Sequence, residues 1–342
     1  MKPDELSAHL AAFLAGETGA RVELANVRSM TGGAAREAWS VDASLERPGS
    51  PVELQTLVVL VFRPGGPGAQ RGFGAREEFR VLEAAAAAGA PVPRPMYAGE
   101  IAPGRAFYAM ERITGETIGR RIVRDDRFAE ARRALPRQLA EALAAIHRVP
   151  LDDGSLAFLP GPAPGEPVAG SELDRLEELY RLIAVDPHPT FELAFRWLRR
   201  HAPASRRRGL VHGDFRIGNV IVDERGLRAV LDWELAHRGD PLEDLGWLCV
   251  RSWRFGADLP VGGVGTREEL FEAYERASGA PVDRDAVHFW EVYGNLRWGV
   301  FTLVQVRGFL DGVAPSIELA SIGRRAAETE WELLELLSGR GA

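Results

Sequence analysis

Three oxygen-bearing side chains flank a short predicted β-hairpin in the second half of the chain. Asp214 and Asn219 precede its first strand, within His-Gly-Asp-Phe-Arg-Ile-Gly-Asn, and Asp232 follows its second strand. Magnesium that carries phosphates takes oxygen ligands from one or two such groups and the rest from substrate and water, so Asn219 and Asp232 are candidate metal ligands. Asp214 is then left to accept or orient the proton of an attacking hydroxyl group. This set of residues predicts phosphoryl transfer.

The spacing of these residues matches a kinase signature, in which an asparagine follows an aspartate in the catalytic loop and a second aspartate stands on the next strand. Asp214, Asn219 and Asp232 hold those three places. The alternative is that Asp, Asn and Gly form a tight turn here, as these residue types favour turns. His212 is interpreted as structural, because Asp214 already fills the proton-transfer role.

A second group of residues, early in the chain, could hold nucleotide phosphates. Gly32 and Gly33 lie between the first two predicted strands, where small residues let backbone amides approach phosphates, although hairpin turns favour glycine as well. Kinases pair a lysine of the third strand with a glutamate of the next helix, and here Arg63 and Glu78 occupy those places. Arginine is a planar fork rather than a point charge. Arg63 as a surface charge, and Glu77 in place of Glu78, stay open as alternatives.

The elements that must position these residues form two groups. Up to about Glu111, β-rich runs alternate with turn residues, and one strong helix, Ala75–Ala88, interrupts them. The chain after Glu111 has long helical patterns, with a loop rich in proline and glycine at Leu151–Gly170. The predicted strands are Val22–Met30, Arg36–Ser44, Leu54–Arg63, Met96–Ile101 and Arg105–Glu111. The predicted later helices are one that ends near His147, then Ser171–Ile183, Pro189–His201, Leu242–Trp253, Arg267–Ala277, Ala286–Leu310 and Pro315–Leu337, with a hairpin of Val220–Val222 and Leu227–Leu231 among them.

Local signals refine the region after the hairpin. Asp240 precedes Pro241 and has Glu243 three residues on, which predicts a helix N-cap with a capping box. The helices that follow carry aromatic residues, among them Trp247, and such residues belong to the core more often than to a pocket.

Composition and charge restrict the class of protein. The chain has 342 residues, of which 46% are hydrophobic and 27% charged, as in folded globular proteins. A net charge of −7 argues against nucleic-acid binding, which needs a positive surface, so small molecules are the expected partners. The single cysteine, Cys249, predicts a reducing compartment such as the cytoplasm, and no apolar run approaches the ~20 residues of a membrane-spanning helix. The sequence does not indicate an oligomeric state.

Two segments, LVHGDFRIGNVIVDE and LDWELAHRGDPLEDLGW, together with the pattern of two lobes, resemble the aminoglycoside phosphotransferase superfamily. The resemblance is closest to the branch related to the kinase-like domain fused to some acyl-CoA dehydrogenases. It implies an α+β fold of the two-lobed protein-kinase type, with a five-stranded antiparallel sheet in the N-terminal lobe and a mainly helical C-terminal lobe. It also implies ATP and Mg²⁺ as cofactors, Asp214 as the catalytic base, and Asn219 and Asp232 as ligands of magnesium.

The same resemblance assigns the segment between the lobes. It implies that the Glu111 carbonyl and the Ile113 amide face the adenine edge, with Met110 behind the ring, and that Asp244 braces the catalytic loop. Residues 1–111 are then the nucleotide-binding lobe and residues 112–342 the catalytic and acceptor-binding lobe.

The expected activity is transfer of the γ-phosphoryl group of ATP to a hydroxyl of a small molecule, such as an aminoglycoside-like antibiotic, a sugar or a hydroxyacyl metabolite. The alternative is a nucleotide-binding pseudokinase that acts as an interaction module, which the arginine at position 63 keeps open.

Overall fold

A computed structural model describes residues 1–30, 36–62, 74–163, 165–204, 207–312 and 316–339. The chain divides into two compact units. The first comprises Met1–Gly115, Leu151–Leu159 and Arg228–Glu234, and the second comprises Glu116–Pro150, Pro160–Leu227 and Leu235–Ala342. The first unit includes two later segments, so the predicted boundary after residue 111 stays a prediction.

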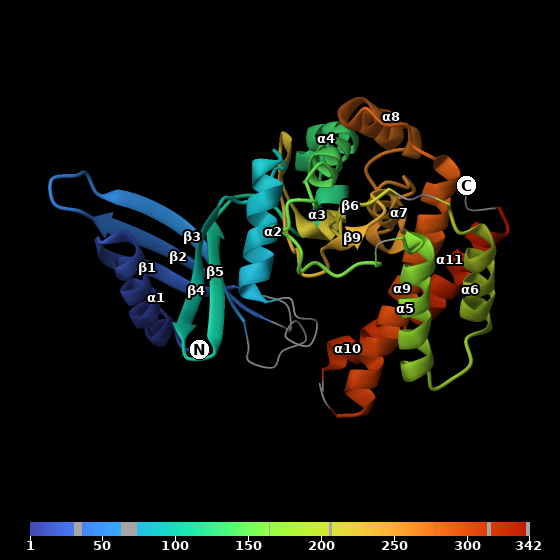
Figure 1. Cartoon of the computed structure of the whole chain (residues 1–342), viewed down its shortest axis with the longest axis horizontal. Helices are drawn as coiled ribbons and strands as arrows, with labels where there is room; N and C mark the ends of the chain where they lie inside the picture. The colour runs from blue at the N-terminus through green and yellow to red at the C-terminus, as the bar shows by residue number, and fades with distance from the viewer. Residues whose placement is uncertain (31–35, 63–73, 164, 205–206, 313–315, 340–342) are drawn as a thin grey trace. The chain divides into compact units, whose positions relative to one another are not determined.

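The first unit is built on a five-stranded antiparallel sheet in the order β1-β2-β3-β5-β4 (Figure 1). Buried positions alternate along the second strand, as expected for a pleated strand with one face in the core. The expected α+β fold with a five-stranded antiparallel sheet is confirmed. The strands are β1 (Arg21–Met30), β2 (Arg36–Glu46), β3 (Glu53–Phe62), β4 (Pro95–Ala102) and β5 (Arg105–Glu111).

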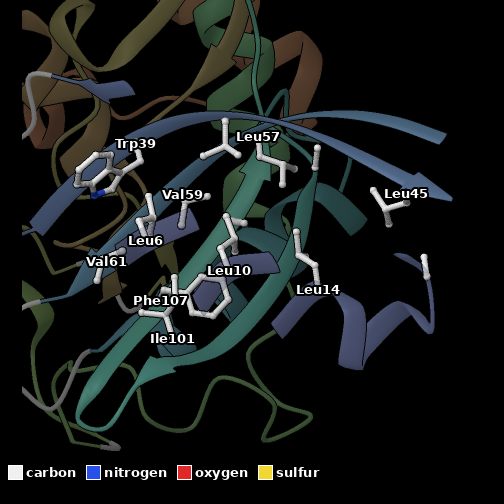
Figure 2. Close-up of a cluster of buried hydrophobic side chains, with 14 residues drawn as sticks. Leu6, Leu10, Leu14, Trp39, Leu45, Leu57, Val59, Val61, Ile101 and Phe107 are labelled. Carbon is white, nitrogen blue, oxygen red and sulfur yellow. The ribbon is translucent and has the colours of Figure 1, made fainter. Parts of the chain in front are cut away.

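Helix α1 (Pro3–Thr18) covers one face of this sheet. Its Leu6, Leu10 and Leu14 are fully buried because a spacing of four residues aligns them on one side of the helix. Figure 2 shows these leucines packed against side chains of the sheet, among them Trp39 and Phe107. This core lies on one face of the sheet, and the helix Ala75–Ala87 lies on the other face.

Helix α2 (Ala75–Ala87) packs against β3, β4 and β5. Its first turn settles which glutamate points inward. The Glu77 carboxylate accepts a hydrogen bond from the Gly74 amide at 3.0 Å, so Glu77 caps the helix. Glu78, in contrast, is only 1% exposed. Glu78 is therefore the glutamate of this turn that points inward, and its predicted pairing with Arg63 stays a prediction.

The second unit is mainly helical, and its apolar stripes explain its packing. In α4 (Ala129–His147), the predicted stripe of Leu135, Leu139, Leu143 and Ile146 is completely buried. None of the described helices is both long enough and apolar enough to cross a membrane. The other helices are α3 (Gly119–Arg124), α5 (Val168–Ile183), α6 (Pro189–His201), α7 (Leu242–Cys249), α8 (Arg267–Ser278), α9 (Arg284–Leu310), α10 (Ile317–Gly323) and α11 (Ala326–Leu337), with short 3-10 turns at Asp126–Phe128, Ile217–Asn219 and Arg251–Trp253.

Two pairs of short strands hold the segments that carry the candidate site. β7 (Val220–Asp223) and β8 (Gly226–Val230) form a two-stranded sheet, as predicted for the hairpin. β6 (Gly209–Val211) pairs antiparallel with β9 (His237–Gly239), which the sequence did not predict. β6 leads directly into His212, and β9 leads into Asp240, so this second pair sets where both polar segments begin.

Three predicted elements differ in the structure. The predicted helix Leu242–Trp253 ends at Cys249, because Val250 takes an extended conformation (ψ 131°) and a 3-10 turn follows. The predicted C-terminal helix is divided in two at Gly323, which packs closely on Val306. Within the predicted surface loop Leu151–Gly170, Leu156 and Leu159 are buried.

Candidate active site

The first unit contains an apolar cavity of about 170 Å³ on the face of the sheet that α2 covers. Val58 and Leu60 of β3 line it, and Leu82 of α2 and Met110 of β5 complete much of its apolar wall. Arg36, Tyr108 and Asp232 also line it and are polar. The cavity thus combines an apolar wall with a few converging polar groups, as small-molecule sites do.

The predicted adenine-contacting residues lie at the end of β5 and just after it. Met110 lines the cavity, and its place behind the adenine ring stays a prediction. Glu111 is exposed and its amide donates to the Arg94 carbonyl at 2.9 Å, while Ile113 is half-buried. The roles of the Glu111 carbonyl and the Ile113 amide stay predictions.

A buried ionic cluster holds the polar side of this cavity. Arg36 Nη1 lies 2.5 and 2.6 Å from the two carboxylate oxygens of Glu78, and the Tyr108 hydroxyl donates to Glu78 at 2.9 Å. The other terminal nitrogen of Arg36 donates to Asp232 Oδ1. One guanidinium therefore connects the α2 glutamate to the predicted metal ligand.

The charges of this cluster are strongly coupled. Burial raises the pKa of Glu78 above its usual range, although the charge of Arg36 opposes the shift. Burial alone would lower the pKa of Arg36, but the negative charges of Glu78 and Asp232 raise it instead. Arg36 is thus a permanent cation whose environment holds it in place.

Arg36 was missed by the sequence reasoning, which gave the phosphate-anchoring role to Arg63. Gly32, Gly33 and Arg63 lie outside the described residues, so their roles stay predictions. Among the described side chains, the cation on Glu78 is Arg36, which stands opposite Phe62 in the register of β2 and β3. The sequence signal for Arg36 was the period-two alternation of β2. This strand buries Trp39 and Val41 in the core on one face, and Arg36 stands on the opposite face.

The carboxylate oxygens of Asp232 are suited to bind a cation. Asp232 adopts a φ of +68°, which is uncommon for a residue other than glycine and is found at functional sites. Its side chain is 34% exposed and already binds the positive guanidinium of Arg36. An accessible carboxylate that holds a cation is the type of ligand that Mg²⁺ takes together with phosphates.

In the second unit, the Asp214 carboxylate is held by three side chains. Its Oδ1 accepts from Trp247 Nε1 at 3.0 Å and from Arg216 Nε at 3.1 Å, and its Oδ2 accepts from Asn219 Nδ2 at 2.6 Å. Asn219 Nδ2 also donates to the Asp214 carbonyl at 2.9 Å, so the Asn219 Oδ1 is left as an acceptor for a cation. The two predicted residues are thus brought together, and Trp247, which is buried in a core cluster, also donates to Asp214.

Asp244 braces the loop that carries Asp214, as the family pattern implied. Its two carboxylate oxygens accept the backbone amides of His212 and Gly213 at 2.8 and 2.9 Å, and His147 Nε2 lies 3.1 Å away. Burial would raise the pKa of Asp244, but these hydrogen bonds and the His147 interaction hold it below its usual range. His212 is completely buried and its Nδ1 accepts from the Asp214 amide, which supports the structural interpretation.

Gly213 is required by this arrangement. It has a φ of +78°, and a Cβ atom there would lie 2.4 Å from the Leu235 carbonyl oxygen. Both the conformation and the close approach exclude a larger residue. Gly213 thus lets the loop pass close to Leu235 while the amides of His212 and Gly213 donate to Asp244.

A second buried network lies beside this loop. His237 Nδ1 lies 2.9 Å from the Leu235 carbonyl and His237 Nε2 lies 3.1 Å from Glu243, which also accepts from Arg297 at 3.1 Å. Burial would lower the pKa of His237, but Glu243 raises it to about 9. The predicted capping box is thus wrong: the N-cap of α7 is Pro241, and Glu243 pairs with His237 and Arg297, while Asp240 accepts the Leu242 amide at 3.1 Å.

Comparisons with known proteins agree with this fold. A family model described as the phosphotransferase enzyme family matches residues 52–290. Acyl-CoA dehydrogenase family member 10 of Mus musculus is 30% identical over 275 residues, which are 75% of this chain and 24% of that protein. The chain thus spans about a quarter of that relative's length.

Two solved structures extend the comparison to the fold. One, from Ralstonia eutropha JMP134 and assigned to the aminoglycoside phosphotransferases, has a TM-score of 0.73 and 25% identity, with 95% of this chain and 97% of that chain covered. A thermostable mutant of an aminoglycoside phosphotransferase, in ternary complex with AMP-PNP and hygromycin B, has a TM-score of 0.62 and 18% identity, with 97% and 99% covered.

The sheet, the helical unit and these matches define a kinase-like phosphotransferase fold. The chain belongs to the phosphotransferase enzyme family. The resemblance to aminoglycoside phosphotransferases and to the kinase-like domain of acyl-CoA dehydrogenases is confirmed.

Proposed function

We propose that the protein is an ATP- and Mg²⁺-dependent phosphotransferase that moves the γ-phosphoryl group to a hydroxyl of a small molecule. The observation that carries this proposal is the Asp214 carboxylate, held by three donors in a loop that Asp244 braces, in a chain of the phosphotransferase family. Phosphoryl transfer relies mainly on positioning and charge stabilisation, so a fixed carboxylate suits it.

Each proposed role follows from the chemistry of the residue. Asp214 orients the acceptor hydroxyl and takes its proton. Asn219 and Asp232 hold Mg²⁺, which neutralises charge that develops on the phosphates. The apolar cavity beside Met110 receives the adenine ring, and Arg63 with Glu78 positions the phosphates. That Asp214, Asn219 and Asp232 gather around one ion is part of the proposal, since Asp232 belongs to the first unit and the other two belong to the second.

The acceptor is proposed only as a class. A structural relative is described in complex with hygromycin B, and another belongs to the choline/ethanolamine kinase family of Mesorhizobium loti. Hydroxylated compounds of these kinds, sugars and hydroxyacyl metabolites are the candidates. A cytoplasmic location and the expected lack of nucleic-acid binding stay predictions.

A second candidate is a nucleotide-binding pseudokinase that does not transfer phosphate. The observation that favours it is the ion pair of Arg36 with Asp232, because a guanidinium there competes with the metal. The pseudokinase and the enzyme differ in turnover but share nucleotide binding.

An untargeted screen with γ-labelled ATP and Mg²⁺ tests the proposal. Wild-type protein is incubated with a panel of hydroxylated metabolites and antibiotics, and Asp214→Asn is run in parallel after its ATP affinity has been measured by calorimetry. The enzyme predicts a labelled product that Asp214→Asn forms at least ~100-fold more slowly at unchanged ATP affinity. ATP binding without labelled product from either protein favours the pseudokinase.

A further inference from the structure

We propose that Arg36 is a second phosphate-binding residue, which exchanges Asp232 for the polyphosphate of the nucleotide when the metal binds. The inference rests on the proposed function and adds to it a residue that no part of the sequence pattern assigned. In this exchange one terminal nitrogen of the guanidinium keeps its hydrogen bonds to Glu78. The other nitrogen leaves the Asp232 carboxylate to the metal and donates to a phosphate oxygen.

The position of Arg36 supports a role toward a ligand. It lines the same cavity as Met110 and Leu60, so its guanidinium borders the space that would receive the nucleotide. Its side chain is only 11% exposed, and its partners hold it there. An arginine that served the fold alone would not need to border this cavity or to reach a carboxylate with an accessible side chain.

The two partners of Arg36 differ in a way that makes such an exchange possible. Glu78 is 1% exposed and also accepts from the Tyr108 hydroxyl, so it is a fixed anchor. The Asp232 side chain is 34% exposed and follows strand β8, where solutes can reach it. The Asp232 contact is therefore the one that a metal ion can replace.

The charge of the cluster favours an added cation. Among the described side chains, the carboxylates of Glu78 and Asp232 share the guanidinium of Arg36, so these three side chains have a formal charge of −1. A divalent ion at Asp232 offsets this excess of negative charge. It also frees the N–H groups of Arg36 Nη2, which can then donate charge-assisted hydrogen bonds to phosphate oxygens.

Arg36→Gln tests this exchange by three binding measurements that need no turnover. Calorimetry measures ATP and adenosine at saturating Mg²⁺, and electron paramagnetic resonance measures Mn²⁺ alone. Arg105→Gln is the matched control, because Arg105 also pairs with a glutamate of this sheet, at 3.1 Å, but does not line the cavity. Arg36→Lys, which keeps the charge but cannot span both partners, replaces Arg36→Gln if that variant does not fold.

Loss of the Arg36 guanidinium is expected to lower the affinity for ATP and to raise the affinity for Mn²⁺. Arg36→Gln lowers ATP affinity at saturating Mg²⁺ about 10- to 100-fold, leaves adenosine affinity within about twofold, and raises Mn²⁺ affinity about tenfold because Asp232 has lost its competitor. Arg36→Lys shifts both affinities in the same directions by smaller factors, and Arg105→Gln changes none of them. Unchanged ATP and Mn²⁺ affinities, or a parallel loss of ATP and adenosine, overturn the role of Arg36. Wild-type protein that binds neither ATP nor adenosine overturns the proposed function itself.

Discussion

Asp244→Asn tests whether a buried carboxylate fixes the loop that carries Asp214. Asp244 is completely buried and accepts the amides of His212 and Gly213 at 2.8 and 2.9 Å, with His147 at 3.1 Å. Asparagine keeps one oxygen and places an NH₂ group where the second was. One backbone amide then faces a donor and has no acceptor.

The cost follows from these contacts. A buried amide without a partner costs about 1–3 kcal/mol, and a hydrogen bond to a charged group contributes about 1.5–3 kcal/mol. We expect the free energy of unfolding to fall by about 3 kcal/mol. For a unit of roughly 200 residues, this corresponds to a melting temperature lower by about 6–12 °C.

Differential scanning calorimetry measures this shift, with Glu272→Gln as the control. Glu272 pairs with Arg276 on the surface at 3.6 Å, and its side chain is 63% exposed. Losing that pair is expected to cost at most ~0.5 kcal/mol. If Asp244→Asn melts within 2 °C of Glu272→Gln, on the order of the control's effect, then Asp244 does not brace the loop and the account of the site is wrong.

Three further changes test separate parts of the structure. The folded pKa of His237, about 9, lies above the usual value of 6.5, so its stabilising contribution is complete below pH 6.5 and is lost as pH rises to about 9. The free energy of unfolding measured by urea titration between pH 6 and 9.5 should fall by on the order of 3 kcal/mol more in wild type than in His237→Gln, and equal slopes refute the assignment. Trp247→Phe removes one of the three donors to Asp214 and should lower turnover about tenfold at unchanged ATP affinity, whereas an equal loss of both would mean that Trp247 supports the fold instead. Asp232→Asn should abolish the effect of Mg²⁺ on ATP binding in calorimetry, and a persistent Mg²⁺ effect would remove Asp232 from the metal site.

The sheet and most helices were predictable because their signals are local. The five strands of the first unit are β-rich runs bounded by turn residues, and they were placed within two residues of their observed ends, apart from the end of β3 that adjoins residues 63–73. The apolar stripe of α4 fixed that helix in the same way. β6 and β9 have three residues each, too few to show a period, and they pair only because the intervening chain brings them together.

The chemistry was predictable where residues lie close in sequence. Asp214 and Asn219 are five residues apart in one loop and are observed in contact. The partners of Arg36 lie 42 and 196 residues away, and no local pattern encodes a contact over such a separation. No local pattern encodes the contact of Trp247 with Asp214 either, because 33 residues separate them. The buried indole N–H of Trp247 finds its acceptor in Asp214.

A crystal structure of the protein with Mg²⁺ and a non-hydrolysable ATP analogue tests the central proposal most directly. The account predicts an ion about 2.0–2.1 Å from Asn219 Oδ1 and from an Asp232 oxygen, bridged to the phosphates, with the Asp214 carboxylate next to the γ-phosphate and outside the coordination shell. A metal bound elsewhere, or nucleotide phosphates that do not approach these three side chains, would contradict it.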